Sequence, residues 1–200
     1  MNRKLGAASA AFCLLAVLGF AISMPFGWND GSYFCSMLLA LGFVPMMGCF
    51  LHFAEPARKS AGHAAAAFAG AYAAIILPVY FTQLTAVRAG GLTEQARQLL
   101  DFQQMGLFFS FDLLGYALMS LAAFFAGLTL RPETAAERWL RALLLLHAAF
   151  VPSCLLAPVL GLFRADTPAW IGIAVLEVWC ACFVPIAALS CVHFLRQSES

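Results

Sequence analysis

Six long apolar stretches, separated by short polar breaks, constrain the fold of this 200-residue chain more than any other feature. The stretches lie at about 5–26, 32–53, 63–86, 103–130, 139–162 and 169–194. Because a helix rises 1.5 Å per residue, about 20 apolar residues are enough to cross the hydrocarbon core of a bilayer. Thr134 with Glu137, and Thr167 with Pro168, predict the starts of the fifth and sixth helices. We therefore predict an all-α integral membrane protein in which residues 1–200 form one domain, a bundle of six transmembrane helices.

Composition excludes a soluble protein and a nucleic-acid binder. Hydrophobic residues make up 63% and charged residues 10% of the chain, against about 45–50% and about 25% in an average soluble domain. The net charge of +1, from 11 basic and 10 acidic residues, is too small for electrostatic binding of a phosphate backbone. The seven cysteines include no C-x-x-C pair, so they predict buried apolar thiols and neither a redox relay nor a zinc site.

Basic residues are divided unevenly between the two sides that six spans define. Arg88, Arg97 and Arg164 fall on one side. The other side carries Arg3, Lys4, Arg58, Lys59, Arg131, Arg138, Arg141 and Arg196. Because basic loops stay in the cytoplasm, we predict a cell-membrane protein with both termini cytoplasmic. The alternative is a cleaved signal peptide at the first stretch, which would leave five spans and an outward N-terminus.

The outer segment between the third and fourth spans, residues 88–104, is the longest connection. Thr93 can cap a short helix over 93–100 that gathers Leu92, Ala96, Leu99 and Leu100 on one face. Such a helix lies on the membrane surface. A plain connector is favoured over a lid.

Two acidic residues fall inside predicted spans, Asp112 in the fourth and Glu177 in the sixth. Each follows the start of its span by about eight residues, which places both about 12 Å below the outer boundary. Intramembrane acids usually face the bundle interior and carry function. The residues that join them at similar depth or on the same helix face are Tyr116, Tyr80, Gln83 and Ser153. We predict that these groups form an outward-opening substrate or proton site; the alternative is a pair of protonated carboxyls bonded to neighbouring helices for structure alone.

Four spans contain an internal proline: Pro45, Pro78, Pro152 and Pro185. Each removes a donor and frees a carbonyl one turn earlier, so these helices are predicted to be interrupted or kinked. Three of the four sites read Phe-Val-Pro, which suggests inverted repeats of the kind found in transporters. Chance recurrence with simple kinking is the favoured alternative.

The histidines offer a weaker alternative site. His52, His147 and His193 all fall toward the cytoplasmic half, and imidazoles from different helices can bind a metal or haem. His52 and His193 are predicted to reach water at the interface, and we expect no metal or cofactor.

The third span carries a ladder of small residues, Gly62, Ala66, Gly70 and Ala74. Such a ladder lets helix backbones approach closely. We predict packing inside the bundle, with a homo-oligomer or partner-subunit seam as the alternative.

No nucleophile elbow, H-E-x-x-H motif or dense acidic metal motif occurs, so a non-enzymatic role is favoured. In size and helix count, with alanines four apart at Ala7 and Ala11, the chain resembles the substrate-binding subunits of energy-coupling-factor importers. The prediction is a small permease or substrate-binding membrane subunit for a small apolar or cationic molecule, in which Asp112 and Glu177 could exchange a proton. Two alternatives stay open: an intramembrane lipid-modifying enzyme with Asp112 or Glu177 as acid or base, and a non-catalytic sensor or assembly partner.

Overall fold

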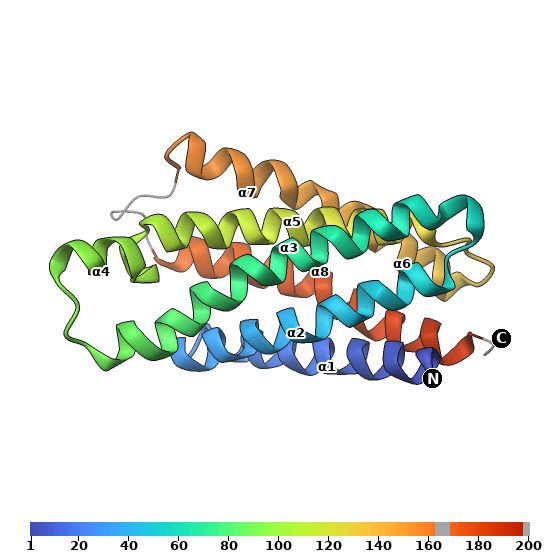
Figure 1. Cartoon of the computed structure of the whole chain (residues 1–200), viewed down its shortest axis with the longest axis horizontal. Coiled ribbons are helices and arrows are strands. Elements are labelled where there is room, and N and C mark those ends of the chain that lie inside the picture. The colour runs from blue at the N-terminus through green and yellow to red at the C-terminus, as the bar shows by residue number, and fades with distance from the viewer. Residues whose placement is uncertain (163–168, 198–200) are drawn as a thin grey trace.

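The computed structural model describes residues 1–162 and 169–197, which are helical and contain no strand. Figure 1 shows the long helices running back and forth along one axis, with both termini at the same end. The helices are α1 (Asn2–Ser23), α2 (Asn29–Phe53), α3 (Lys59–Thr82), α4 (Glu94–Leu100), α5 (Leu107–Thr129), α6 (Ala135–Leu146), α7 (Phe150–Val159) and α8 (Ala169–Arg196). Four short turns join them: η1 (Pro56–Arg58), η2 (Gln83–Val87), η3 (Phe102–Gln104) and η4 (His147–Ala149).

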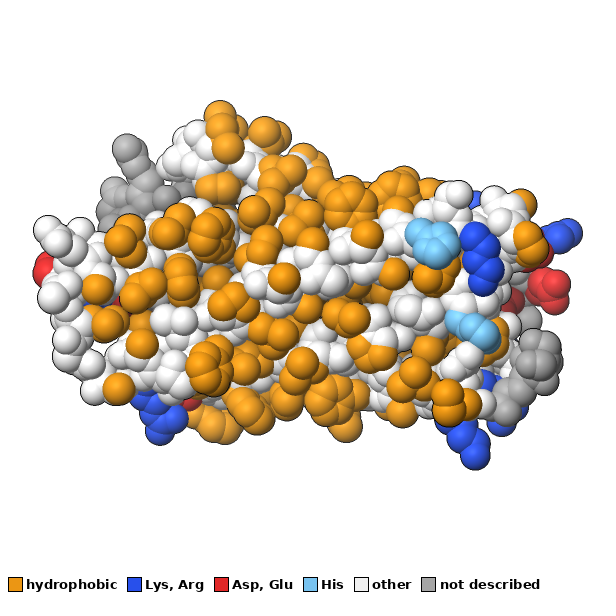
Figure 2. Space-filling view, in the orientation of Figure 1, with side chains coloured by type: hydrophobic (Ala, Val, Ile, Leu, Met, Phe, Trp, Pro, Cys, Tyr) orange, Lys and Arg blue, Asp and Glu red, His pale blue; other side chains and the backbone are white. Residues whose placement is uncertain are grey.

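Six helical segments of the described chain are long and apolar enough to cross a membrane, which confirms the predicted all-helical class and the six long apolar helices. The segments are Asn2–Ser23, Asn29–Phe53, Pro56–Val87, Leu107–Thr129, Ala135–Val159 and Trp170–Arg196. Apolar side chains cover the middle of the face shown in Figure 2, and charged side chains lie at its two ends. That distribution is what a bilayer solvent requires, because apolar side chains can face lipid at no cost.

Close helix packing depends on small residues at the crossings. α1 packs on α2 and α8, and α3 packs on α2 and α5. A Cβ atom at Gly115 of α5 would lie 2.7 Å from Ile76 of α3, and one at Gly42 of α2 would lie 2.9 Å from Cys13 of α1. In a bilayer no hydrophobic force acts between helices, so close contact of this kind is a main source of cohesion among membrane helices.

Two of the four internal prolines accompany a change in helix type. Pro152 lies just after the 3₁₀ turn η4, which separates α6 from α7. Pro78 precedes the π-helical turn η2 at the end of α3. α2 and α8 stay continuous through Pro45 and Pro185. A proline alone therefore does not interrupt a helix in this bundle, and its effect depends on how the neighbouring helices pack around it.

The predicted helix starts are borne out where the structure describes them. Thr134 and Glu137 form the capping box of α6, and the Thr93 side chain accepts from the Ala96 amide at the start of α4. The predicted cap at Thr167 and Pro168 lies outside the described residues.

Candidate functional site

All four tyrosines of the chain lie within electrostatic reach of the Asp112 carboxyl. Tyr33 comes from α2, Tyr72 and Tyr80 from α3, and Tyr116 from α5. The rings of Tyr33 and Tyr80 stack at 5.4 Å, and those of Tyr72 and Tyr116 lie 6.1 Å apart. Asp112 itself is only 3% exposed. We call these five residues the tyrosine cluster.

Helix periodicity explains how the cluster forms. Asp112 and Tyr116 are four residues apart, and Tyr72 and Tyr80 are eight apart, so each pair lies along one face of its helix. The contact of Gly115 with Ile76 brings α5 and α3 together, so these two faces meet. Tyr33 reaches the same place from the first turns of α2.

The polar groups of the cluster are only partly satisfied. The Tyr80 hydroxyl lies beside the Asp112 carboxyl and the Tyr116 hydroxyl, and Ser36 also lies beside Tyr116. Asp112 Oδ1 and the Tyr72 hydroxyl have no hydrogen-bond partner in the described part of the chain. Nor does any described basic side chain form an ion pair with Asp112. A buried carboxyl without a counter-ion is costly, and such unpaired groups in a native fold often mark a place where something binds.

The connector between α3 and α5 covers the cluster at the end of the bundle opposite the termini (Figure 1). The Gln83 side chain holds it, donating to the Leu100 carbonyl at 2.7 Å and accepting from the Phe102 amide at 3.0 Å. The Phe102 ring then lies 5.8 Å from Tyr33 and 6.0 Å from Tyr80. Gln103 donates to the Tyr33 hydroxyl at 2.9 Å. Gln83, predicted to line the site, is therefore buried and bonded to the backbone of its cover.

Glu177 and Ser153 are not brought into the cluster. Glu177 is half-buried on α8, where its Oε1 has no hydrogen-bond partner among the described residues and Cys180 lies within electrostatic reach one turn later. No interaction between Glu177 and Asp112 is found among the described residues. Ser153 is exposed on α7 and donates to the Phe150 carbonyl. Its neighbour Cys154 is the residue of α7 that comes within electrostatic reach of Asp112.

Sequence reasoning missed two members of the cluster. Tyr33 reads as an aromatic anchor at the membrane boundary, and Tyr72 lies among alanines with no polar neighbour along its helix face. One signal could have pointed to Tyr72: it precedes Tyr80 by eight residues, a spacing that places both side chains on the same helix face.

The three histidines of the weaker alternative lie apart. His52 is exposed and contacts the Asn2 side chain. His147 is 1% exposed, packs on the rings of Phe150 and Trp179, and has no hydrogen-bond partner for either ring nitrogen. Within the described ranges, no group of three or more His, Cys, Asp or Glu side chains could hold a metal ion.

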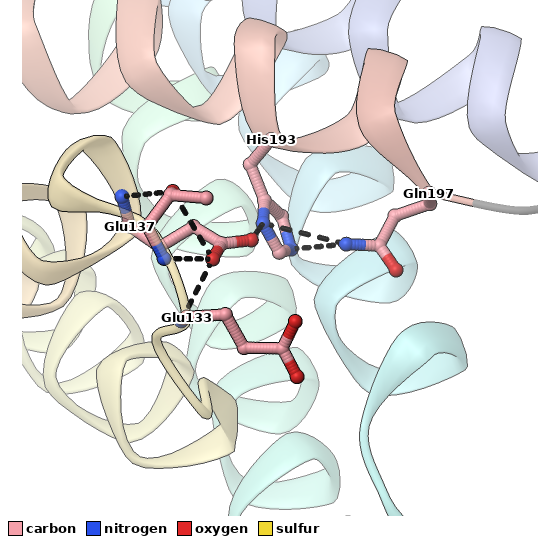
Figure 3. A network of polar contacts seen from close by, with 5 residues as sticks. Glu133, Glu137, His193 and Gln197 are labelled. Atoms are coloured by element: carbon pink, nitrogen blue, oxygen red, sulfur yellow. Dashed lines mark hydrogen bonds and ion pairs between the residues drawn. The ribbon is translucent and has the colours of Figure 1, made fainter.

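His193 belongs to a second polar site, a pocket of about 390 Å³ at the end that carries both termini. His193 Nδ1 lies 3.2 Å from Glu137 Oε1, and Gln197 approaches the other ring nitrogen at 3.2 Å (Figure 3). Glu137 Oε2 accepts from the backbone amides of Glu133 and Thr134. Phe50 stacks on the imidazole at 5.8 Å. We call this site the basic-end pocket.

The ladder on α3 has two different halves. Gly62 is buried against Leu51 of α2, where a Cβ would lie 2.8 Å from the leucine side chain. Ala66 is half-buried, whereas Gly70 and Ala74 are exposed. A groove of about 190 Å³ begins beside Ala74, lined by Ala74, Ile75, Pro78, Val79, Phe108 and Phe111.

Comparison with known protein families, with characterised proteins and with solved structures finds no match for this chain.

Proposed function

We propose that the chain is a small multi-pass permease that binds a small organic cation at Asp112 and exchanges it for a proton. The observation that carries this proposal is the tyrosine cluster: one buried carboxyl, no basic partner among the described residues, and four tyrosine side chains within its electrostatic reach.

The chemistry of the cluster favours a cation. A carboxylate supplies the counter-charge, and an aromatic face attracts a cation by about 0.5–1 kcal/mol at an exposed site and about 2 kcal/mol at a dry one. Because an uncompensated charge within a bilayer costs about 2.5–3.5 kcal/mol even on insertion scales, Asp112 needs either a bound cation or a proton. The two therefore compete for the same carboxyl, which is the basis of exchange.

The bundle also has places where it can change shape. The π turn η2 begins at Gln83, and the 3₁₀ turn η4 interrupts the fifth span at His147. Interrupted helices near a central site are typical of secondary transporters. Movement at η2 would release Gln83 from the connector and open the cluster.

We further propose that both termini are cytoplasmic and that the protein resides in the cell membrane. Eight of the described basic residues belong to elements at the end that carries the termini, and Arg88 and Arg97 lie at the other end. Arg164, which the prediction placed with them, is outside the described residues. This asymmetry supports the proposed orientation.

The direct test is reconstitution into liposomes with tetraethylammonium as the probe cation. Wild type is expected to bind and exchange the probe, and Asp112→Asn, which keeps the shape but not the charge, is expected to do neither. Glu177→Gln is the matched control and should behave as wild type. Equal exchange by wild type and Asp112→Asn would contradict the proposal. Chemical modification of the liposome lipids without cation flux would favour the alternative, an intramembrane lipid-modifying enzyme.

A second candidate function, assembly with a partner, is favoured by the exposed half of the ladder. Gly70 has nothing within 4 Å of its added Cβ, and a groove begins one turn later at Ala74. Exposed small residues in a membrane helix allow another helix to approach. Gly70→Leu should shift the cross-linked oligomer toward monomer without changing cation binding; an unchanged oligomer in both wild type and variant would contradict this candidate.

A further inference from the structure

The basic-end pocket is a cavity that the proposed cation exchange does not use. Its volume of about 390 Å³ falls within the range of about 300–1,000 Å³ that is usual for small-molecule sites. The ends of α2, α5 and α8 and the start of α6 enclose it at the end of the bundle that carries both termini. Helices that span a bilayer end in its polar boundary region, so a ligand dissolved in water can reach the pocket.

One wall of the pocket has its polar groups bonded within the protein itself. His193 Nδ1 lies 3.2 Å from Glu137 Oε1, and Glu137 Oε2 accepts from two backbone amides. Phe50 stacks on the imidazole at 5.8 Å. Because both Glu137 oxygens already accept hydrogen bonds, this wall shapes the pocket and leaves the contacts with a ligand to other side chains.

Two side chains of opposite charge, Glu133 and Arg196, line the pocket without an ion pair among the described residues. The Glu133 side chain extends past Glu137 toward the region below His193 (Figure 3). Arg196 follows His193 by three residues in the last turn of α8. Each of the two charges is therefore available to a ligand group of the opposite charge.

The rest of the lining is neutral or compensated. Arg131 and Glu55 form an ion pair at 3.4 Å, and Phe50, Phe53 and Leu130 provide an apolar wall. Phe50 and Leu130 are only 1% and 5% exposed. Because burying apolar ligand surface against such a wall is favourable, the pocket suits a molecule that has two opposite charges and an apolar part.

We propose that the basic-end pocket binds an α-amino acid with an apolar side chain. The ammonium group of the ligand donates to the Glu133 carboxylate, and its carboxylate accepts from the Arg196 guanidinium, so both hydrogen bonds are charge-assisted. Its side chain packs against Phe50 and Phe53. A simple cation would face the uncompensated guanidinium and a simple anion the uncompensated carboxylate, each at an electrostatic cost. This site is separate from Asp112, and the inference does not depend on cation exchange.

The test is calorimetric titration of the full chain in detergent with L-leucine as the probe. Wild type is expected to bind it, and Asp112→Asn should bind it equally, because the tyrosine cluster is a different site. Glu133→Gln and Arg196→Gln each remove one charge at an exposed position. Each should weaken binding by at least about tenfold, the size expected for loss of one charge-assisted hydrogen bond. Arg138→Gln, which removes an exposed charge of α6 outside the pocket lining, is the matched control and should bind as wild type.

Three analogues, titrated into Asp112→Asn so that no cation binds at Asp112, test the ligand chemistry. 4-Methylpentanoate lacks the ammonium group, leucinamide lacks the carboxylate, and glycine lacks the apolar side chain. Each should bind at least about tenfold more weakly than L-leucine, because each loses one of the three contacts.

Absence of L-leucine binding in wild type, or wild-type affinity in Glu133→Gln and Arg196→Gln, would overturn the inference and leave the proposed function standing. Loss of L-leucine binding in Asp112→Asn would overturn it too, because the probe would then occupy the tyrosine cluster. Phosphoethanolamine binding as tight as that of L-leucine, with the same dependence on Glu133 and Arg196, would instead assign the pocket to a lipid headgroup and overturn the amino-acid assignment.

Discussion

Two acidic side chains of the bundle, Glu137 and Asp112, have opposite surroundings. Glu137, in the basic-end pocket, has both oxygens occupied by backbone amides, a hydroxyl and His193. Asp112, in the tyrosine cluster, has one oxygen with no partner among the described residues and no described basic neighbour. A carboxyl with every oxygen bonded contributes to holding its helices together. A buried carboxyl with an oxygen that lacks a hydrogen bond costs stability, and that oxygen is available to a ligand.

The largest expected effect follows from removing Asp112, the carboxyl with an oxygen that has no described hydrogen-bond partner. Asp112→Leu should reduce tetraethylammonium binding by about a hundredfold or more, since it removes the counter-charge. It should not lower the free energy of unfolding, because the variant no longer buries an unpaired charge. Calorimetric binding and denaturant unfolding in detergent measure the two quantities. Large destabilisation by Asp112→Leu would show that Asp112 stabilises the fold as Glu137 does, which would contradict the difference between the two carboxyls.

Removing Glu137, whose carboxylate oxygens are all hydrogen-bonded, should lower stability instead of ligand binding. Glu137→Ala should lower the free energy of unfolding by about 2 kcal/mol, because it removes a capping box and the partner of a buried histidine. Glu133→Ala is the control, since the Glu133 carboxylate has no described partner (Figure 3). Equal unfolding midpoints for the two variants would show that the Glu137 network contributes nothing.

The cover of the tyrosine cluster offers a smaller effect. Gln83→Ala removes two hydrogen bonds to the connector and should loosen it by about 1–2 kcal/mol. Hydrogen exchange at the Phe102 amide should then be faster by about tenfold, the factor that corresponds to 1.4 kcal/mol. The exposed Gln98 on α4, whose side chain donates to Glu94 within the same helix, is the control position. Unchanged exchange at Phe102 in Gln83→Ala would mean that aromatic packing alone holds the cover.

The smallest effect compares two tyrosine hydroxyls within the cluster. Tyr72→Phe removes a buried hydroxyl without a partner and should change the free energy of unfolding by less than about 0.5 kcal/mol, or raise it. Tyr33→Phe removes an acceptor that Gln103 uses and should cost about 1 kcal/mol. Thermal unfolding distinguishes the two, and equal losses would mean that the Tyr72 hydroxyl has a partner after all.

Local features of the chain could be predicted because they depend on neighbours in sequence. The six helical segments follow from apolar length, and the caps at Thr93 and Thr134 follow from side-chain chemistry within one turn. The stripe of Asp112 and Tyr116 follows from helix periodicity. Prolines were less informative: Pro152 accompanies a break and Pro45 does not, since the outcome depends on whether neighbouring helices support the kink.

Long-range placement could not be predicted in the same way. Equal depth made Asp112 and Glu177 candidates for one site, yet Glu177 lies within electrostatic reach of Cys180 on its own helix, and four tyrosines lie within electrostatic reach of Asp112. Depth along a helix follows from residue number, but rotation about the helix axis is set by which helices pack against it.

The sequence by itself determined that this protein is a bundle of six apolar helices with a rare acid inside the fourth. Those properties depend on composition, helix rise and local capping, each of which acts over a few residues. Only the tertiary structure decided that Tyr33 and Tyr72 join Asp112, that Gln83 holds the cover, and that His193 pairs with Glu137. These contacts join residues up to about 80 positions apart, and their formation depends on the close packing of whole helix faces.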